Sequence, residues 1–224
     1  MKHQGKAAKA ARRILLVGLV LELLLITGLL LAHVVPMLAL FAVSTLFLFF
    51  VAFTLYFFRD PDAQVPTGPG LIVAPAHGLV DVVEEFDEPK VMAGRCWRVS
   101  IFLSVFDVHV QQAPVSGQVC FRQHTPGKYL NALKSDCAFH NENVLLGFET
   151  TEPAVGRVGV RLIAGLIARR IIPWVEMGGA VQKGERIALI QFGSRADVYL
   201  PLRAKVTVKP GDRVVGGETV IAKV

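Results

Sequence analysis

The feature that most constrains this chain is a long apolar segment near its N-terminus. Residues 14–58 contain a single ionised side chain, Glu22, among Leu, Val, Ala and Phe. Apolar stretches of about 20 residues are typical of membrane-spanning helices. The segment predicts two spans, 14–32 and 37–58, separated by a reversal at Pro36. At about 1.5 Å of rise per residue, each span comes close to the roughly 30 Å hydrocarbon core of a bilayer.

Two other interpretations of this segment were weighed. A cleaved signal peptide has one short apolar region followed by a cleavage site of small residues, so the second span argues against it. A buried helical hairpin in a soluble protein is less consistent with such a long, almost uncharged segment. The sequence therefore favours a two-helix transmembrane hairpin.

Basic residues set the expected orientation of this hairpin. The positive-inside rule places a basic flank in the cytoplasm, and an even number of spans returns the rest of the chain to the same side. We therefore expect a protein of the cytoplasmic membrane whose soluble part faces the cytoplasm. The reversal carries no Lys or Arg, whereas five precede the first span: Lys2, Lys6, Lys9, Arg12 and Arg13.

The charge of the remaining chain excludes one class of partner. Residues 59–224 contain nineteen Lys and Arg against seventeen Asp and Glu, about +2 in all. A domain this close to neutral gives no basis for nucleic-acid binding. The three cysteines, Cys96, Cys120 and Cys137, have neither an even number nor a familiar ligand spacing, so the sequence predicts no disulfide framework and no metal site.

The pattern changes after the second span. Residues 59–70 form a linker rich in Pro and Gly, and residues 71–224 contain short apolar runs broken by turn residues every eight to twelve positions. This spacing is typical of an all-β sandwich or barrel. The expected organisation is a basic tail (1–13), a membrane anchor (14–58), the linker and a β-rich domain.

A repeat near the C-terminus refines the expected fold. A G-x-x-V-x-x-G-E motif at Gly178–Glu185 recurs, shifted by 33 residues, at Gly211–Glu218. Paired hairpins of this kind are similar to those of the lipoyl/biotinyl-like barrel-sandwich. No carrier lysine stands at a hairpin tip, so any chemistry must come from another group. A membrane-anchored binding or adaptor domain without chemistry is one function that fits the repeat.

Several segments together resemble the phosphatidylserine decarboxylases in their short, membrane-anchored form. The likeness covers roughly residues 57–224, and its pieces occur in the family's order, which makes the set specific where each alone is not. The segments are FFRDP (57–61), VAPAHG (73–78), FDVHVQQAPVSG (106–117), ARRI (168–171) and FGSRADVYLP (192–201).

The resemblance implies a proenzyme that cuts itself at Gly193-Ser194. The Ser194 hydroxyl attacks the Gly193 carbonyl, and an ester replaces the amide. Loss of the Ser194 α-proton eliminates the ester and leaves a dehydroalanine, which hydrolyses to a pyruvoyl group and ammonia. Residues 1–193 then become the larger subunit and residues 194–224 the smaller.

The resemblance also implies the cofactor, the substrate and the partners. The cofactor is the covalent pyruvoyl group formed from Ser194, whose ketone accepts the electron pair left when the carboxylate of phosphatidylserine departs as CO₂. The product is phosphatidylethanolamine. The implied partners are the lipid bilayer, phosphatidylserine and the protein's own two subunits, and a homo-oligomer is left open.

Two histidines are candidates for proton transfer. His109 matches the histidine that the family uses near the pyruvoyl group, as a proton donor or a base. His77 stands where the family usually has an aspartate that orients a second histidine, and that second histidine is replaced by Gln112. Either His77 itself is the base that activates Ser194, with Asp81 as a candidate to orient it, or His109 does both jobs, or processing is slow or absent. We favour His77.

Three arginines are candidates for substrate binding. A guanidinium group suits both a lipid phosphate and a serine carboxylate, although a solvated strand face is an equally good interpretation. The candidates are Arg169, Arg170 and Arg195. The sequence thus favours a pyruvoyl-dependent phosphatidylserine decarboxylase, with the adaptor domain and an unprocessed, inactive homologue as alternatives.

Overall fold

The computed structural model describes residues 2–31, 36–128, 130, 140–165, 170–191 and 194–224. The chain divides into two compact units. One contains Gly5–Asp60, and the other contains Met1–Gln4 together with Pro61–Val224.

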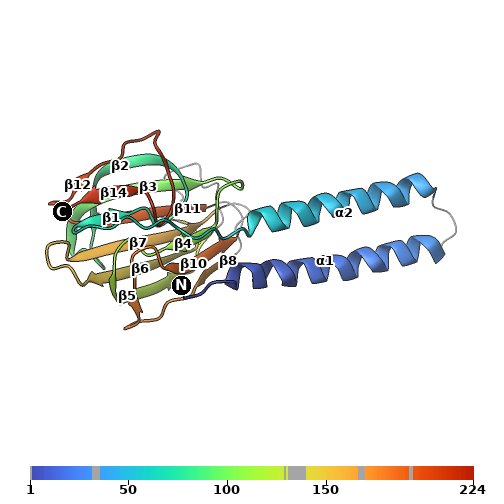
Figure 1. The fold of residues 1–224 in the computed structure, drawn as a ribbon, viewed down its shortest axis with the longest axis horizontal. Helices are drawn as coiled ribbons and strands as arrows, with labels where there is room; N and C mark the ends of the chain where they lie inside the picture. The colour runs from blue at the N-terminus through green and yellow to red at the C-terminus, as the bar shows by residue number, and fades with distance from the viewer. Residues whose placement is uncertain (1, 32–35, 129, 131–139, 166–169, 192–193) are drawn as a thin grey trace. The chain divides into compact units, whose positions relative to one another are not determined.

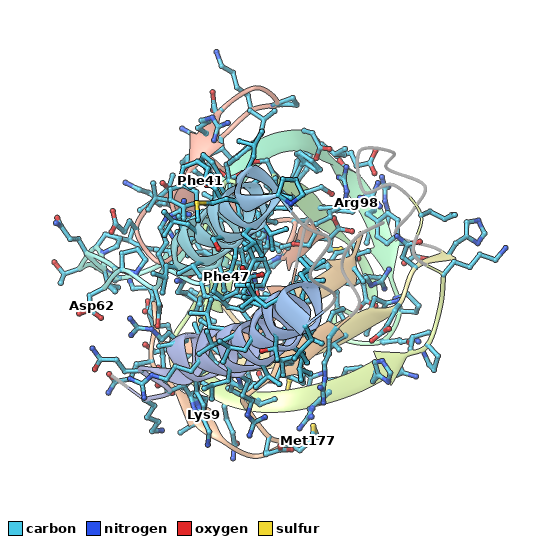
Figure 2. The ribbon with its side chains drawn as sticks, turned by 90° about the vertical axis from the view of Figure 1, so that its right-hand side faces the viewer. Lys9, Phe41, Phe47, Asp62, Arg98 and Met177 are labelled. Atoms are coloured by element: carbon cyan, nitrogen blue, oxygen red, sulfur yellow. The ribbon has the colours of Figure 1, made fainter. Side chains whose placement is uncertain are left out.

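The first unit consists of two helices, α1 (Lys6–Leu31) and α2 (Met37–Phe57). Both are long and apolar enough to cross a membrane, by length and composition. The backbone of Pro36 is extended, so it ends the reversal and precedes the first turn of α2. Gly18 lets the helices approach, because a Cβ there would lie 2.8 Å from the Phe50 ring. Figure 2 shows the side chains of both helices, with Phe41 labelled on α2.

The second unit is built from antiparallel strands, which confirms the prediction of a mainly β fold (Figure 1). Its largest element is a curled eight-stranded sheet. In spatial order the strands are β13 (Arg213–Val214), β2 (Gly78–Glu88), β3 (Gly94–Leu103), β11 (Ser194–Leu200), β7 (Arg157–Ala164), β6 (Asn143–Thr150), β5 (Gly117–Thr125) and β9 (Ala180–Val181).

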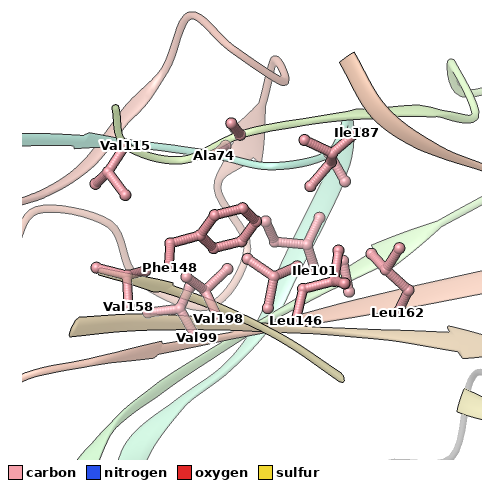
Figure 3. Close-up of a cluster of buried hydrophobic side chains, with 14 of the residues drawn as sticks. Ala74, Val99, Ile101, Val115, Leu146, Phe148, Val158, Leu162, Ile187 and Val198 are labelled. Carbon is pink, nitrogen blue, oxygen red and sulfur yellow. The ribbon is translucent and has the colours of Figure 1, made fainter. Parts of the chain in front are cut away.

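Two small sheets complete this unit, each with three strands. The hydrophobic core lies between them and the large sheet. Figure 3 shows Phe148 and Leu146 of the large sheet pointing toward Ala74, Val115 and Ile187 on the opposite side. In spatial order, the strands of one small sheet are β1 (Leu71–Val73), β14 (Val220–Lys223) and β12 (Lys205–Val206). Those of the other are β4 (Val110–Gln112), β10 (Arg186–Gln191) and β8 (Arg170–Pro173).

The β unit has an internal two-fold relation that extends beyond the Gly-Glu repeat. An A-P-x-x-G-x-V motif occurs at residues 74–80, after β1, and again 39 positions later at residues 113–119, after β4. The two copies exchange equivalent hydrogen bonds: Gln112 N donates to Pro75 O (2.8 Å) and Val73 N donates to Pro114 O (3.0 Å). The strands β1 and β2 in one half therefore correspond to β4 and β5 in the other.

The Gly-Glu repeat obeys the same relation and brings the edges of the large sheet together. Gly184 and Gly217 both have φ of +76° and donate equivalent hydrogen bonds of 2.8 Å to Ala113 O and Ala74 O. A Cβ on Gly217 would lie 3.5 Å from the Gly184 Cα, so the two turns face each other. Each turn follows an edge strand of the eight-stranded sheet, β9 or β13. Contact between the turns therefore fixes the curl of that sheet.

The face of the eight-stranded sheet away from the core carries buried charged groups. Asp197 on β11 is fully buried, and its register partners are Ser100 on β3 and Arg161 on β7. Arg98, labelled in Figure 2, lies on the same face of β3 and pairs with Glu84 of β2. Neither carboxylate oxygen of Asp197 has a hydrogen-bond partner of acceptable geometry among the described residues.

Burial raises the pKa of Asp197 above its ordinary value of 3.8, opposed by the Ser100 hydroxyl and the guanidinium groups of Arg98, Arg195 and Arg161. Consider pH values between the pKa of Asp197 in the unfolded chain and its higher pKa in the folded protein. In this interval the carboxyl has lost its proton in the unfolded chain but keeps it in the folded protein. The free energy of unfolding therefore falls as pH rises through that interval, by about 1.4 kcal/mol for each pH unit.

We predict that Asp197→Asn removes this pH-dependent loss. The thermal midpoint of the variant in detergent, minus that of the wild type, should be larger at pH 7 than at pH 4, because only the wild type has the Asp197 carboxyl whose contribution to stability falls as pH rises. The control is Asp87→Asn, at an exposed position of β2. A difference between Asp197→Asn and wild type that stays constant from pH 4 to pH 7 would contradict a raised pKa.

Candidate active site

Ser194 is the first residue of β11, in the middle of the eight-stranded sheet. Its side chain lies on the same face of β11 as those of Ala196 and Val198, so it points to the core side of the sheet. The residue is fully buried, and its hydroxyl oxygen has no hydrogen-bond partner among the described residues. A buried hydroxyl without a partner is costly in a purely structural serine, which makes it a candidate for chemistry. Gly193 lies outside the described residues.

His109 lies beside the strand that leads to Ser194. It immediately precedes β4, and its carbonyl oxygen accepts a hydrogen bond of 3.1 Å from Ile190 N of β10. Strand β10 ends at Gln191 in a small sheet, and β11 begins at Ser194 in the large one. The structure thus brings His109 next to the segment where the chain changes sheets.

The ring of His109 is held in one tautomer. Its Nδ1 lies 2.9 Å from the carbonyl oxygen of Asp107, which can only accept a hydrogen bond. Nδ1 therefore carries the proton in the neutral ring, and Nε2 is the nitrogen that can take up a second one. The residue itself is fully buried.

Sequence reasoning missed Asp107 as a residue that positions His109. Its carboxylate accepts hydrogen bonds of 2.8 Å from both the backbone N and the hydroxyl of Ser104, and one of 3.2 Å from Arg213. These bonds fix the turn between β3 and β4, and with it the carbonyl that orients the His109 ring. The signal was present in the sequence, because a Ser-x-x-Asp pattern is typical of such a turn.

His77 lies at the same end of the large sheet as Ser194. The residue after it, Gly78, begins β2 next to Phe102 of β3, and Leu103 of β3 is the register partner of Ser194. Two strand spacings, roughly 10 Å, therefore separate the start of β2 from Ser194. Gly78 is required there, because a Cβ would lie 2.2 Å from the Phe102 carbonyl oxygen.

Gln112 lies close to the segment that carries His77. Its side-chain oxygen is buried and has no hydrogen-bond partner among the described residues. A Cβ on Gly216 would be 2.3 Å from that oxygen and 3.2 Å from the Ala76 Cα. The fold therefore brings together the segments that carry positions 77 and 112, the two positions at which the resemblance led us to expect a different pair of residues.

The candidate arginines fall in different places. Arg169 lies outside the described residues. Arg170 is exposed at the start of β8, with Gln191 as its register partner, and so lies near the change of sheets. Arg195 is 1 % exposed and alternates with Ser194, so it points to the other face of the sheet, where it pairs with Asp81. Asp81 thus contacts Arg195; its expected role toward His77 is untested, as is substrate binding by the arginines.

The described residues contain no group of three or more His, Cys, Asp and Glu side chains placed to hold a metal ion. Cys96 and Cys120 are free thiols, and Cys137 lies outside the described residues. The apolar neighbours of Ser194 and its buried hydroxyl suit a small covalent group formed at this position. That a metal is not needed stays a prediction.

Comparison with known proteins places this geometry in a family. Residues 50–222 match the family model described as phosphatidylserine decarboxylase. A phosphatidylserine decarboxylase proenzyme of Symbiobacterium thermophilum is 47% identical over 171 residues, which cover 76% of this chain and 79% of that protein. Proenzymes of the same name from Desulfotalea psychrophila (42% identical, 80% and 83% covered) and Zymomonas mobilis (44% identical, 75% and 70% covered) are also similar. The chain belongs to the phosphatidylserine decarboxylase family.

Proposed function

We propose that this protein decarboxylates phosphatidylserine to phosphatidylethanolamine after cutting itself between Gly193 and Ser194. The observation that carries the proposal is the buried hydroxyl of Ser194, which has no hydrogen-bond partner among the described residues, at the point where the chain changes sheets. Family membership supplies the substrate, since the similar proteins are named as phosphatidylserine decarboxylase proenzymes. The competing adaptor function needs no such hydroxyl.

Self-cleavage follows from the position of Ser194. Its oxygen attacks the carbonyl carbon of Gly193, and the Gly193–Ser194 amide becomes an ester as the amine is released. Removal of the Ser194 α-proton then expels the Gly193 carboxylate and leaves a dehydroalanine. Water converts this group to a ketone with loss of ammonia. In the 31-residue piece from 194 to 224, β11 remains between β3 and β7 of the eight-stranded sheet, and its hydrogen bonds to these strands hold the new chain end.

We assign the base for this cut to His77. An imidazole can take the hydroxyl proton unaided, whereas the amide of Gln112 has no titratable proton and cannot replace a histidine. The position of His77 supports this assignment, because it lies near the start of β2, across β3 from Ser194. His109 performing both roles is the alternative.

In decarboxylation we assign His109 the role of proton donor. The pyruvoyl group, when present, supplies a carbonyl that binds the substrate amine and withdraws the electrons of the breaking bond. Nδ1 of His109 donates its hydrogen bond to the Asp107 carbonyl oxygen. Nε2 is therefore the nitrogen that delivers a proton to the carbon that loses CO₂. We assign binding of the lipid phosphate or the serine carboxylate to Arg170, and its exposed position beside Gln191 supports this role.

Ser194→Ala should leave the chain whole, because no hydroxyl remains to attack Gly193. Wild type should give a 31-residue C-terminal piece with a blocked, pyruvoyl-like end, seen on a denaturing gel and by intact mass. Ser116→Ala, at the position equivalent to His77 in the other half, is the control and should be cut normally. A wild-type chain that stays whole would contradict the decarboxylase assignment and favour an adaptor domain or an inactive homologue.

Substitution of the two histidines should separate their roles. His77→Ala should slow self-cleavage by about 10²–10⁴-fold, the usual contribution of a general base. His109→Ala should still be cut, and the cut form should lose decarboxylation by a similar factor. His124→Ala, at an exposed site beside Glu142, is the control. Normal cutting of His77→Ala together with failed cutting of His109→Ala would reassign the base to His109.

We further propose that the β unit faces the cytoplasm from the cytoplasmic membrane. The five basic residues before α1 and the two apolar helices support this orientation. Protease added to inverted membrane vesicles should digest the β unit, and protease added to right-side-out vesicles should not. Digestion from the outer side would reverse the assignment.

A further inference from the structure

A β-bulge occurs at equivalent places in the two halves of the β unit. The register of β2 against β3 shifts between Val80 and Val82, and the register of β5 against β6 shifts between Val119 and Phe121. The bulged residues are Asp81 and Cys120, which are 39 positions apart like the A-P-x-x-G motifs. Because both halves have the bulge, it belongs to the fold and does not depend on an acidic residue.

The halves differ in what the bulge carries. A bulge re-aims a side chain out of the regular alternation. Asp81 accepts two hydrogen bonds from Arg195, one of 2.8 Å from Nη1 to Oδ1 and one from Nη2 to Oδ2. Strand β3 lies between β2 and β11, so this bidentate pair reaches across a whole strand.

The arginine at the equivalent position in the other half has a different partner and a different exposure. The row of register partners Leu79, Phe102 and Arg195 corresponds to the row Gln118, Glu149 and Arg157. Arg157 bonds to Glu149 on the adjacent strand, and both are about half exposed. Arg195 is instead 1 % exposed. Its partner Asp81 is 28 % exposed, so the arginine is the buried member of the pair. Among the described residues, a pair that crosses a whole strand and buries its arginine is thus found at this position only in the half that contains Ser194.

The location of the pair relates it to the reacting residues. Arg195 directly follows Ser194, and Asp81 lies four residues after His77 on β2. Removing the arginine's charge from water is costly, so this ion pair is poor evidence for stability by itself. Its bidentate geometry is strict, however, and fixes the two strands relative to each other. Chain ends also fray unless they are held, and Ser194 becomes a chain end after the cut.

We propose that the Asp81–Arg195 pair is a positioning device for Ser194, in both forms of the protein. Before the cut it holds the serine at a fixed place relative to His77. After the cut it holds the new chain end, with the group formed from Ser194, in its place in the sheet. Both residues act through Ser194 and touch neither substrate nor reacting atoms. The inference rests on the proposed function.

The test uses the full-length protein in detergent. Asp81→Asn and Arg195→Lys should each slow appearance of the 31-residue piece by tenfold or more. In the fraction that is cut, kcat for phosphatidylserine in mixed micelles should fall while KM changes less than twofold. The matched controls are Glu149→Gln and Arg157→Lys, which break the pair made in the other half by Arg157, the equivalent of Arg195. They should stay within twofold of wild type in both measurements.

A rescue variant separates positioning from folding. In the double variant Asp81→Glu with Arg195→Lys, the longer acidic side chain compensates for the shorter basic one. This double variant should recover part of the cleavage rate lost by Arg195→Lys alone. Rates equal to wild type in Asp81→Asn and Arg195→Lys would overturn the inference. So would loss of folding in all three variants, judged by their thermal midpoints, because the pair would then hold the sheet and not the serine.

The two failures can be told apart. If the wild-type chain is never cut, the proposed function is wrong, and this inference is wrong with it. If the wild-type chain is cut and the variants of the Asp81–Arg195 pair are cut at the same rate, only the positioning role is wrong.

Discussion

The structure of the β unit depends on one reciprocal contact between its halves. Gln112 N donates to Pro75 O and Val73 N donates to Pro114 O, so each A-P-x-x-G segment is hydrogen-bonded to the other. Buried backbone groups need partners, and here each half supplies what the other lacks. The Gly184 and Gly217 turns meet beside this contact and set the curl of the large sheet. The position of every strand in the candidate site follows from these contacts.

The candidate site is an asymmetric set of side chains on this symmetric backbone. His77 corresponds to Ser116, and Asp81 corresponds to Cys120. The backbone requires neither a histidine nor a carboxylate at these positions, since the other half has Ser116 and Cys120 there. Side chains that differ between equivalent positions are therefore the ones to connect with chemistry, and they lie in the half that contains Ser194.

The replacements at positions 77 and 112 also fit this frame. The backbones of residues 75 and 112 are joined by a hydrogen bond, and Gly216 leaves room for the Gln112 side chain beside Ala76. Residues 77 and 112 therefore lie in segments that contact each other, and in this chain they are an imidazole and an amide.

The sequence by itself determined the features that depend on local pattern. Two uninterrupted apolar runs specify helices, and glycines at a spacing of 33 residues specify equivalent turns, because neighbouring residues decide both. The family's motifs singled out Ser194 and His109, and strand alternation alone would have placed Arg195 on the face opposite Ser194. Only the tertiary structure decided that Arg195 pairs with Asp81. These residues are 114 positions apart and are separated by another strand, so their contact depends on strand order and on a bulge. No local spacing encodes either.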